Sequence, residues 1–274
     1  MAIPLEDNYD DIIGKAQRGL RISDSQLAEM SGLTAGQIRM LREGEIDEEV
    51  ILRIAPALSL DARALLASAR QEWKPVDLQG LDGLSQFVTP YEDITVNAYL
   101  VWDRASREAV AFDTGADCVE MLACLESEQL TVKLILLTHE HTDHIADLRR
   151  LRERTRAPVF ISERETAEGA QPIAEGKKFV VGKLQIEARL TSGHSVGGMT
   201  YVVDGLARPV AIVGDSLFAG SMGGGMISYE DAFRNNLEKI LTLPDETILC
   251  PGHGPLTSVG EEKRHNPFFA AKFK

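Results

Sequence analysis

The feature that most constrains this chain is a cluster of metal-type side chains at residues 139–144. Three of the six histidines in the sequence lie there, directly after the apolar run 134–137. Residues two apart in an extended chain point the same way, so His139 and His141 can face one metal. Asp143 and His144 then begin a helix and can turn toward a neighbouring position. Imidazole and carboxylate are ligands of zinc, iron and manganese. This loop is therefore predicted to supply ligands to two adjacent metal ions.

Three further candidate ligands occupy similar places later in the chain. His194, Asp215 and His253 each lie in a turn that follows an apolar run. A rigid sheet can aim side chains at its strand ends into one site. We therefore interpret the seven residues as one constellation and not as scattered surface residues.

This pattern resembles the metallo-β-lactamase superfamily over about residues 85–274. The resemblance implies an α/β fold of the αββα type, in which two sheets pack face to face with helices outside. It implies that the first metal is held by His139, His141 and His194, the second by Asp143, His144 and His253, and that Asp215 bridges them. Asp113, within 112–115, matches a family aspartate that supports the ligands from behind. A simple turn residue is the alternative interpretation of Asp113.

The order of elements in the second part of the chain agrees with such a fold. Short β-rich runs occur at 94–102, 109–112, 132–137, 158–161, 179–181, 184–190, 199–203, 209–213 and 247–249. Helical segments come between them at about 117–128, 143–154 and 230–241, and the glycine run 220–225 predicts a loop. Strands and helices mixed in this way predict helices that cover sheets.

Residues 1–72 are predicted to form a separate all-α domain, followed by a linker at 73–84 and the hydrolase domain at 85–274. Apolar residues recur at spacings of three and four, and Ser23 or Asp24, Thr34, Asp47, and Ser59 or Asp61 are suited to cap successive helices. The stretch 25–44 resembles an Xre-like helix-turn-helix of the phage-repressor type. In that resemblance, Arg39 and Arg42 would reach a DNA groove.

The charge of the chain argues against nucleic acid as a partner. The net charge is −13, and residues 1–70 hold eight Lys or Arg against twelve Asp or Glu. Neutralisation of phosphates supplies most of the affinity for DNA, so an acidic domain is a poor DNA binder. The alternative is a helical bundle used for packing or as a homodimer interface.

The remaining composition bears on location. No run approaches the roughly 18 apolar residues of a membrane span. The first residues have neither a basic region nor an apolar stretch, which argues against a signal peptide. Three cysteines without metal-type spacing fit a reducing compartment. We expect a cytoplasmic protein that does not contact membranes and acts on a small molecule.

The predicted site implies hydrolysis. Two divalent ions, zinc first and iron or manganese as alternatives, can share a water and lower its pKa toward ~7. The bridging hydroxide is then the nucleophile, with Asp143 and Asp215 as the catalytic carboxylates that orient it and pass on a proton.

Two segments point to one branch of the superfamily. Residues 213–221 and 251–268 are similar to glyoxalase II, which hydrolyses hydroxyacylglutathione thioesters. This resemblance implies a small thioester or ester as substrate. The chain departs from the branch in two places, because 195–198 holds no second histidine and 221–225 no arginine. The alternatives are a mononuclear-iron persulfide dioxygenase and a metabolite-sensing DNA-binding regulator.

Overall fold

The computed structural model describes residues 3–78 and 80–274 and begins with a group of short helices. These are α1 (Tyr9–Leu20), α2 (Asp24–Ser31), α3 (Ala35–Arg42), α4 (Glu48–Ala57) and α5 (Ala62–Ala69). The side chains of Ser23, Thr34, Asp47 and Asp61 each accept a hydrogen bond from a backbone amide in the first turn of a helix. The predicted caps are thus confirmed, because these short polar side chains satisfy amides that have no partner within the helix.

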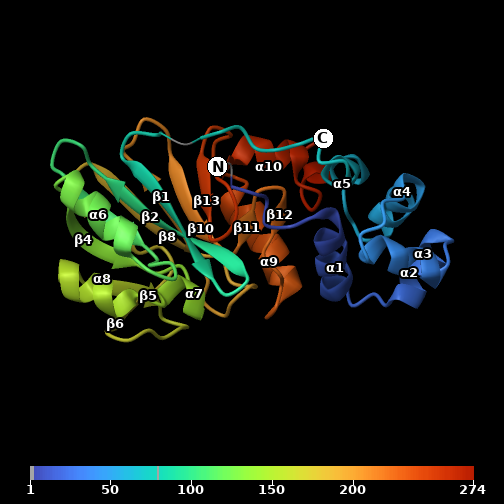
Figure 1. Ribbon diagram of the computed structural model, residues 1–274, viewed down its shortest axis with the longest axis horizontal. Coiled ribbons are helices and arrows are strands. Elements are labelled where there is room, and N and C mark those ends of the chain that lie inside the picture. Colours follow the sequence, from blue (N-terminus) through green and yellow to red (C-terminus); the bar gives the residue numbers. More distant parts are fainter. Residues whose placement is uncertain (1–2, 79) are drawn as a thin grey trace.

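Two six-stranded sheets form the second part of the chain (Figure 1). The first contains, in spatial order, β1 (Leu84–Tyr91), β2 (Ile94–Trp102), β3 (Glu108–Phe112), β4 (Thr131–Leu136), β5 (Val159–Ser162) and β6 (Ala170–Ile173). The second contains β14 (Thr257–Ser258), β13 (Ile248–Pro251), β10 (Val210–Gly214), β9 (Met199–Asp204), β8 (Leu184–Leu190) and β7 (Lys178–Val181). A small hairpin joins β11 (Leu217–Phe218) to β12 (Ser221–Met222).

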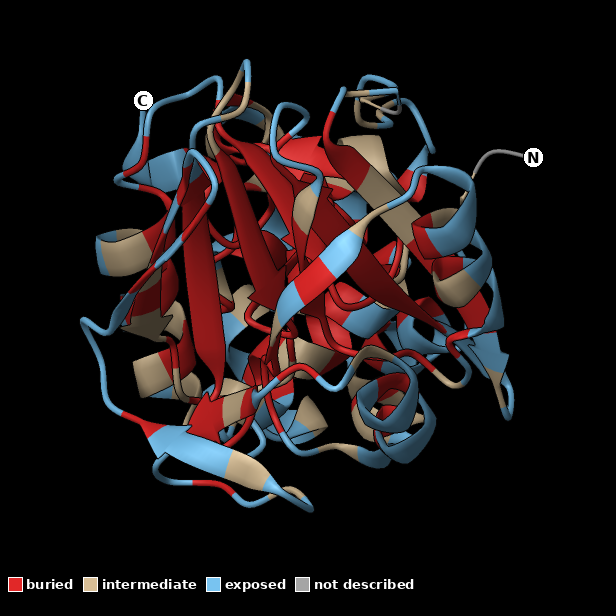
Figure 2. Ribbon diagram, turned by 90° about the vertical axis from the view of Figure 1, so that its left-hand side faces the viewer, coloured by how far each residue is buried: buried red, intermediate tan, exposed pale blue. Residues whose placement is uncertain are grey.

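The buried faces of the two sheets explain why these segments form strands. Tyr99, Val101 and Phe112 of the first sheet pack with Ile186 and Tyr201 of the second in one apolar cluster. Figure 2 shows the central strands as mostly buried and the surrounding loops and helix faces as largely exposed. Alternating side chains of facing sheets interdigitate in this way in sandwich folds.

Helices cover the outer face of each sheet, so the predicted αββα arrangement is confirmed. On the first sheet, α6 (Val119–Ser127) and α8 (Leu148–Thr155) contribute Met121 and Leu151 to a second apolar cluster. On the second sheet, the cover includes α9 (Tyr229–Asn235) and α10 (Val259–His265).

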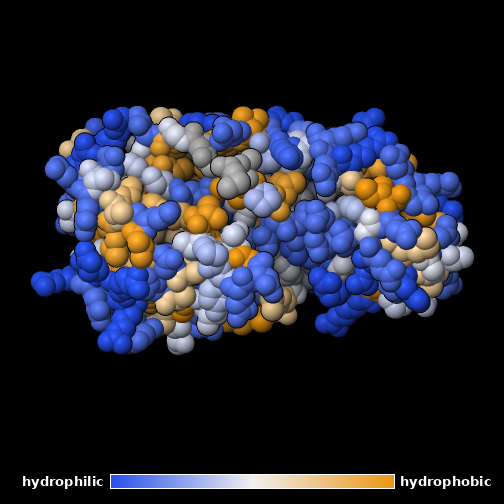
Figure 3. Space-filling view, viewed as in Figure 1, coloured by the Kyte–Doolittle hydropathy of each residue, from blue (hydrophilic) through white to orange (hydrophobic). Residues whose placement is uncertain are grey.

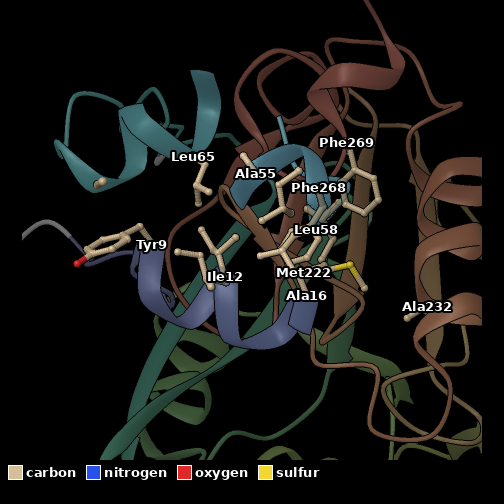
Figure 4. Packing of buried hydrophobic residues seen from close by; sticks show 14 of the residues in the cluster. Tyr9, Ile12, Ala16, Ala55, Leu58, Leu65, Met222, Ala232, Phe268 and Phe269 are labelled. Carbon is tan, nitrogen blue, oxygen red and sulfur yellow. The ribbon is translucent and has the colours of Figure 1, made fainter. Parts of the chain in front are cut away.

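The N-terminal helices share the outer core of the second sheet. A third apolar cluster joins Ile12 of α1 and Ile54 of α4 to Met222, Phe268 and Phe269 (Figure 4). Over α1–α5 the face in Figure 3 is largely hydrophilic, with a hydrophobic patch beside α4. The bundle is therefore packed on the sheet domain through apolar side chains. The predicted division at 1–72, 73–84 and 85–274 remains a prediction.

The structure adds β1, β6, β11, β14 and α10 to the predicted elements, and it differs from the prediction within three predicted segments. The segment 143–154 is interrupted between α7 (Thr142–Ile145) and α8, where the amide of Asp147 donates to the hydroxyl of Thr114 and its carboxylate accepts a hydrogen bond from the amide of Cys118. The segment 230–241 passes from α9 into a π-helix (Asn236–Ile240), in which the side-chain amide of Asn236 donates to the carbonyl of Ala232 at 3.0 Å. The glycine run 220–225 is not wholly a loop, since it contains β12.

No helix in residues 3–78 and 80–274 has both the length and the apolar character needed to cross a membrane.

Candidate metal centre

The seven candidate ligands come together where strands of both sheets end. His139 and His141 follow β4 of the first sheet, and Asp143 and His144 lie in α7 directly after them. The others follow strands of the second sheet: His194 comes after β8, Asp215 after β10 and His253 after β13. Loops from facing sheets thus meet over one edge of the sandwich.

Four of the residues form a first group. His139, His141, His194 and Asp215 each offer one nitrogen or oxygen atom, and these atoms all lie within 4.8 Å of one another. Nε2 of His194 lies 3.1 Å from Nδ1 of His141 and 3.3 Å from Oδ2 of Asp215. Oδ2 of Asp215 is also 4.0 Å from Nε2 of His139. This spacing leaves room for one ion among the four.

The other three residues form a second group beside the first. Ligand atoms of Asp143, His144 and His253 again lie within 4.8 Å of one another. Oδ2 of Asp143 is 3.6 Å from Nε2 of His144 and 3.4 Å from Nε2 of His253. Asp215 reaches this group too, with Oδ1 3.3 Å from His144 and Oδ2 3.4 Å from His253. Its carboxylate therefore occupies the place that a bridging ligand would take.

Buried polar atoms without partners support the fit of metal ions. Among the described residues, Nε2 of His139, Nε2 of His144 and Oδ1 of Asp215 are buried and make no hydrogen bond. An unsatisfied buried polar atom costs about 1–3 kcal/mol. Divalent cations would satisfy all three at once, and the mixed imidazole and carboxylate set suits zinc, iron or manganese.

The charges within the centre are strongly coupled. Burial lowers the pKa of His139 well below its usual value, so this imidazole is neutral. Burial is the largest influence on His144 and His253 and opposes their charge, but Asp215 together with Asp113 at His144 and with Asp143 at His253 outweighs it, so that their pKa values rise to about 10 and about 11. Without metal, His144 and His253 are thus protonated, and their positive charges lie beside Asp215. Because a ligating imidazole must be neutral, metal binding would release these protons.

Hydrogen bonds behind the rings fix their orientation. Nδ1 of His144 lies 2.9 Å from Oδ2 of Asp113, and Nδ1 of His253 lies 2.6 Å from the carbonyl of Thr95. Nδ1 of His194 faces the carbonyl of Gly224 at 3.2 Å. Such acceptors hold the proton on Nδ1 and leave Nε2 for a metal. Asp113 thus lies where the sequence predicts a supporting residue.

Asp113 also holds the strand end that carries the first histidine. Its two oxygens accept hydrogen bonds from the amide and the hydroxyl of Thr138, both at 2.7 Å. The backbone of Asp113 has φ +55°, a left-handed conformation that Asp and Asn tolerate better than most residues.

Sequence reasoning missed Glu165, which joins two of the ligand loops. Its buried carboxylate accepts hydrogen bonds from the amide of Glu140 at 2.7 Å and the amide of Gly197 at 2.8 Å. Glu140 lies between two candidate ligands and Gly197 lies three residues after another. A single glutamate in a loop carries no pattern that could have revealed this role.

Two glycines were also missed. A Cβ at Gly252 would lie 2.0 Å from Oδ1 of Asp215 and 2.6 Å from Cε1 of His144. A Cβ at Gly223 would lie 1.7 Å from the carbonyl oxygen of Asp215. Only glycine lets the backbone approach the centre this closely.

The two arginines predicted as DNA contacts are not part of this centre. Arg39 and Arg42 lie in the last turn of α3, and Arg42 is 3.4 Å from Asp24 in an exposed ion pair. Their proposed role in DNA binding remains a prediction.

Comparisons with known proteins agree with the geometry. Residues 91–253 match the family described as the metallo-beta-lactamase superfamily. The chain is 32% identical over 205 residues to "Probable metallo-hydrolase YqgX" of Bacillus subtilis, covering 65% of this chain and 94% of that protein. It is 27% identical over 210 residues to "Hydroxyacylglutathione hydrolase GloC" of Haemophilus influenzae, covering 68% of this chain and 98% of the relative.

A solved structure gives the same result. The crystal structure of ETHE1 from Myxococcus xanthus has a TM-score of 0.60 and 29% identity, and the similarity covers 68% of this chain and 85% of that one. The fold, the histidine and aspartate cluster and the matched range all agree. This chain therefore belongs to the metallo-beta-lactamase superfamily.

Proposed function

We propose that the protein is a dinuclear metal-dependent hydrolase of a small thioester or ester, similar to glyoxalase II. The observation that carries this proposal is the pair of adjacent ligand groups with Asp215 between them. The likeness to a hydroxyacylglutathione hydrolase supports the choice of bond. Zinc is the proposed ion, with iron or manganese as alternatives.

The ligand set explains how such a reaction would proceed. Two divalent ions held here would lower the pKa of a shared water toward ~7 and polarise the carbonyl under attack. Asp143 and Asp215 would orient the attacking water. Asp143 is the more exposed of the two, with 14% of its side chain accessible against 7% for Asp215. It is therefore the better placed to hand a proton to the leaving thiol or alcohol.

Apolar side chains beside His194 support a small acyl substrate. Val196, Met226 and Ile227 are exposed, and the amide of Ile227 donates to the carbonyl of Gly193 at 3.0 Å. The loop that carries Met226 and Ile227 is thus held against the loop that carries His194. Exposed apolar groups next to a polar centre are suited to bind the apolar part of a ligand.

The test is hydrolysis of S-lactoylglutathione by protein loaded with zinc, iron or manganese. Turnover that is lost in His139→Ala would support the proposal. His265→Ala is the matched control, because His265 stacks on Trp73 with ring centroids 5.3 Å apart and takes no part in the centre. If metal is bound but no thioester, ester or lactone is hydrolysed, the proposal fails.

A mononuclear-iron persulfide dioxygenase is the second candidate. The structural likeness to ETHE1 is the observation that favours it. It would use two histidines and one aspartate of the centre. One iron per chain, with sulfite formed from glutathione persulfide, would favour this reaction over hydrolysis.

The third candidate, a metabolite-sensing DNA-binding regulator, rests on α2 and α3. These two helices are joined through Gly32, whose φ of +65° fits a tight turn. Salt-dependent binding of the protein to its own upstream DNA, lost in a combined Arg39→Ala and Arg42→Ala variant, would support it. The helical bundle as a homodimer interface is a separate proposal, and deletion of the bundle without change of oligomeric state would remove it.

A further inference from the structure

The N-terminal segment, residues 3–8, lies directly against the loop that carries His253. Gly254 has φ +76°, and a Cβ there would lie 3.2 Å from the amide nitrogen of Glu6 and 3.6 Å from the carbonyl oxygen of Pro4. These distances mean that the segment crosses the residue next to a candidate ligand in van der Waals contact. We call this N-terminal segment the wall, because it lies beside the loop that carries a candidate ligand.

Three contacts of Lys15, in α1, hold this wall in place. Its ammonium forms a 2.5 Å ion pair with Asp7 of the N-terminal segment and donates to the carbonyl of Met222 at 3.0 Å. The same ammonium lies 4.8 Å above the ring of Phe218, whose edge-on partner is the ring of His253 at a centroid distance of 5.7 Å. The segment and α1 are thus held against the β11–β12 hairpin beside the centre.

Glu6 differs from its neighbours in the N-terminal segment because they line a cavity and it does not. Ile3, Pro4, Leu5, Asp7 and Asn8 line a cavity of about 680 Å³ that is also bordered by Trp73 and Leu256. Glu6 is the one residue of the segment that does not line it. The Cβ of Glu6 lies 3.5 Å from the position that a Cβ of Gly254 would take. The side chain of Glu6 therefore starts beside the residue that follows the candidate ligand His253.

The carboxylate of Glu6 is available to a ligand. It is half-buried, and burial raises its pKa. In residues 3–78 and 80–274 no hydrogen bond or ion pair engages it, whereas the neighbouring Asp7 is paired with Lys15. Because Asp7 and Lys15 neutralise each other, the net charge of this wall is the charge of Glu6. An unpaired, half-buried carboxylate attracts cations and hydrogen-bond donors and repels carboxylates.

We propose that Glu6 selects the substrate of this centre, favouring a leaving group that is cationic or donates hydrogen bonds over one that carries a carboxylate. The inference rests on the proposed hydrolase function and names a substrate class for it, in which a thioester with a cationic thiol is hydrolysed faster than S-lactoylglutathione, whose thiol carries carboxylates. The family match begins at residue 91. The match to YqgX covers 94% of that relative but 65% of this chain, so 35% of this chain lies outside it. The wall thus lies outside the range that matches the family.

The first experiment compares two small thioesters of opposite charge on the zinc-loaded full chain. Acetylthiocholine carries a quaternary ammonium, and S-acetylthioglycolate carries a carboxylate at a similar distance from the sulfur. We expect kcat/KM to favour acetylthiocholine, the preference to fall roughly tenfold in Glu6→Gln, and the order to reverse in Glu6→Lys. Zinc bound per chain should stay the same. Glu29→Gln and Glu29→Lys, at an exposed position in α2, are the matched controls and should keep the preference of the wild type.

A second measurement separates this inference from the hydrolase proposal. Calorimetric titration of the zinc-loaded protein with thiocholine and with thioglycolate needs no turnover. If no thioester, ester or lactone is hydrolysed but Glu6→Lys reverses the binding preference between the thiols, the hydrolase proposal fails and the role of Glu6 stands. A preference that changes by less than twofold in Glu6→Lys overturns the role of Glu6. Failure of both thiols to bind also overturns it, since no small ligand would then reach the wall.

Discussion

The carboxylate of Asp113 lies 2.9 Å from Nδ1 of His144, behind the ring that faces Asp215 with its other nitrogen. This contact decides which nitrogen of His144 carries a proton. A carboxylate accepts the Nδ1 proton and leaves Nε2 free for a metal. The orientation of His144 in the second ligand group therefore depends on the carboxylate of Asp113, which directly follows β3 of the first sheet.

We expect Asp113→Asn to weaken metal binding by roughly 10–100-fold. Asparagine keeps the shape and the left-handed backbone, but its amide must present a donor either to His144 or to Thr138. Zinc affinity, measured by competition with a chelating dye, would report the loss. Asp117→Asn, at an exposed position four residues later, should bind zinc like the wild type. Equal affinity in the two variants would contradict the role of Asp113.

Glu165 is expected to stabilise the fold and the centre together. In Glu165→Ala the amides of Glu140 and Gly197 lose their acceptor, so the free energy of unfolding should fall by roughly 2–4 kcal/mol. Glu165→Gln should lose less, because one oxygen remains. Urea unfolding with and without zinc would measure both effects. A loss in Glu165→Ala of under ~0.5 kcal/mol would show that the two amides find other partners.

Gly252→Ala should disrupt the metal centre. The added methyl group would overlap Oδ1 of Asp215, and neither this atom nor His144 can move without displacing a candidate ligand. We expect zinc affinity to fall by more than about tenfold. Gly36→Ala is the control, since a Cβ there meets no atom closer than 3.8 Å and alanine favours the helix by about 0.5 kcal/mol. Zinc bound by Gly252→Ala at wild-type affinity would refute the close approach.

Glu262 predicts a pH dependence of stability. This buried carboxyl accepts hydrogen bonds from Gly220, Thr257 and Asn266, yet burial raises its pKa from 4.5 to about 7. Between these values the folded chain binds more protons than the unfolded chain, so stability falls as pH rises through this window. Over the whole window the loss from this group is roughly 3 kcal/mol.

The variant Glu262→Gln isolates this effect. Its amide can donate to Thr257 while its oxygen accepts from Asn266 and Gly220, so the neutral side chain fits the same place. The difference in unfolding free energy between Glu262→Gln and wild type should move in favour of the variant from pH 4.5 to pH 8. Urea unfolding at both pH values measures it. A difference that is constant with pH would mean that Glu262 keeps its ordinary pKa.

The sequence could predict the part of the centre in which histidines, which are rare in this chain, lie close together in the sequence. Three histidines at 139, 141 and 144, directly after an apolar strand, are typical of metal ligands, and strand ends gather the remaining ones. The capped helices and most strands are likewise encoded locally, by caps and by periodicity.

Other features depend on contacts between distant parts of the chain. At the break before α8, Asp147 makes hydrogen bonds with Thr114 and Cys118, about 30 residues earlier in the chain. Glu165 and Glu6 are single carboxylates in irregular segments, and their partners lie 25 to about 250 positions away. Neither spacing nor composition contains that information.

The contact between Glu6 and Gly254 can form only late in the synthesis of the chain. The two positions are nearly 250 residues apart, so nearly the whole chain must leave the ribosome before they can meet. Contacts of such long sequence separation form late and slow folding. Newly made chains should therefore gain their strands and helices well before they gain a closed centre, and a chain cut short before His253 would lack both the residue against which the wall packs and a complete ligand set.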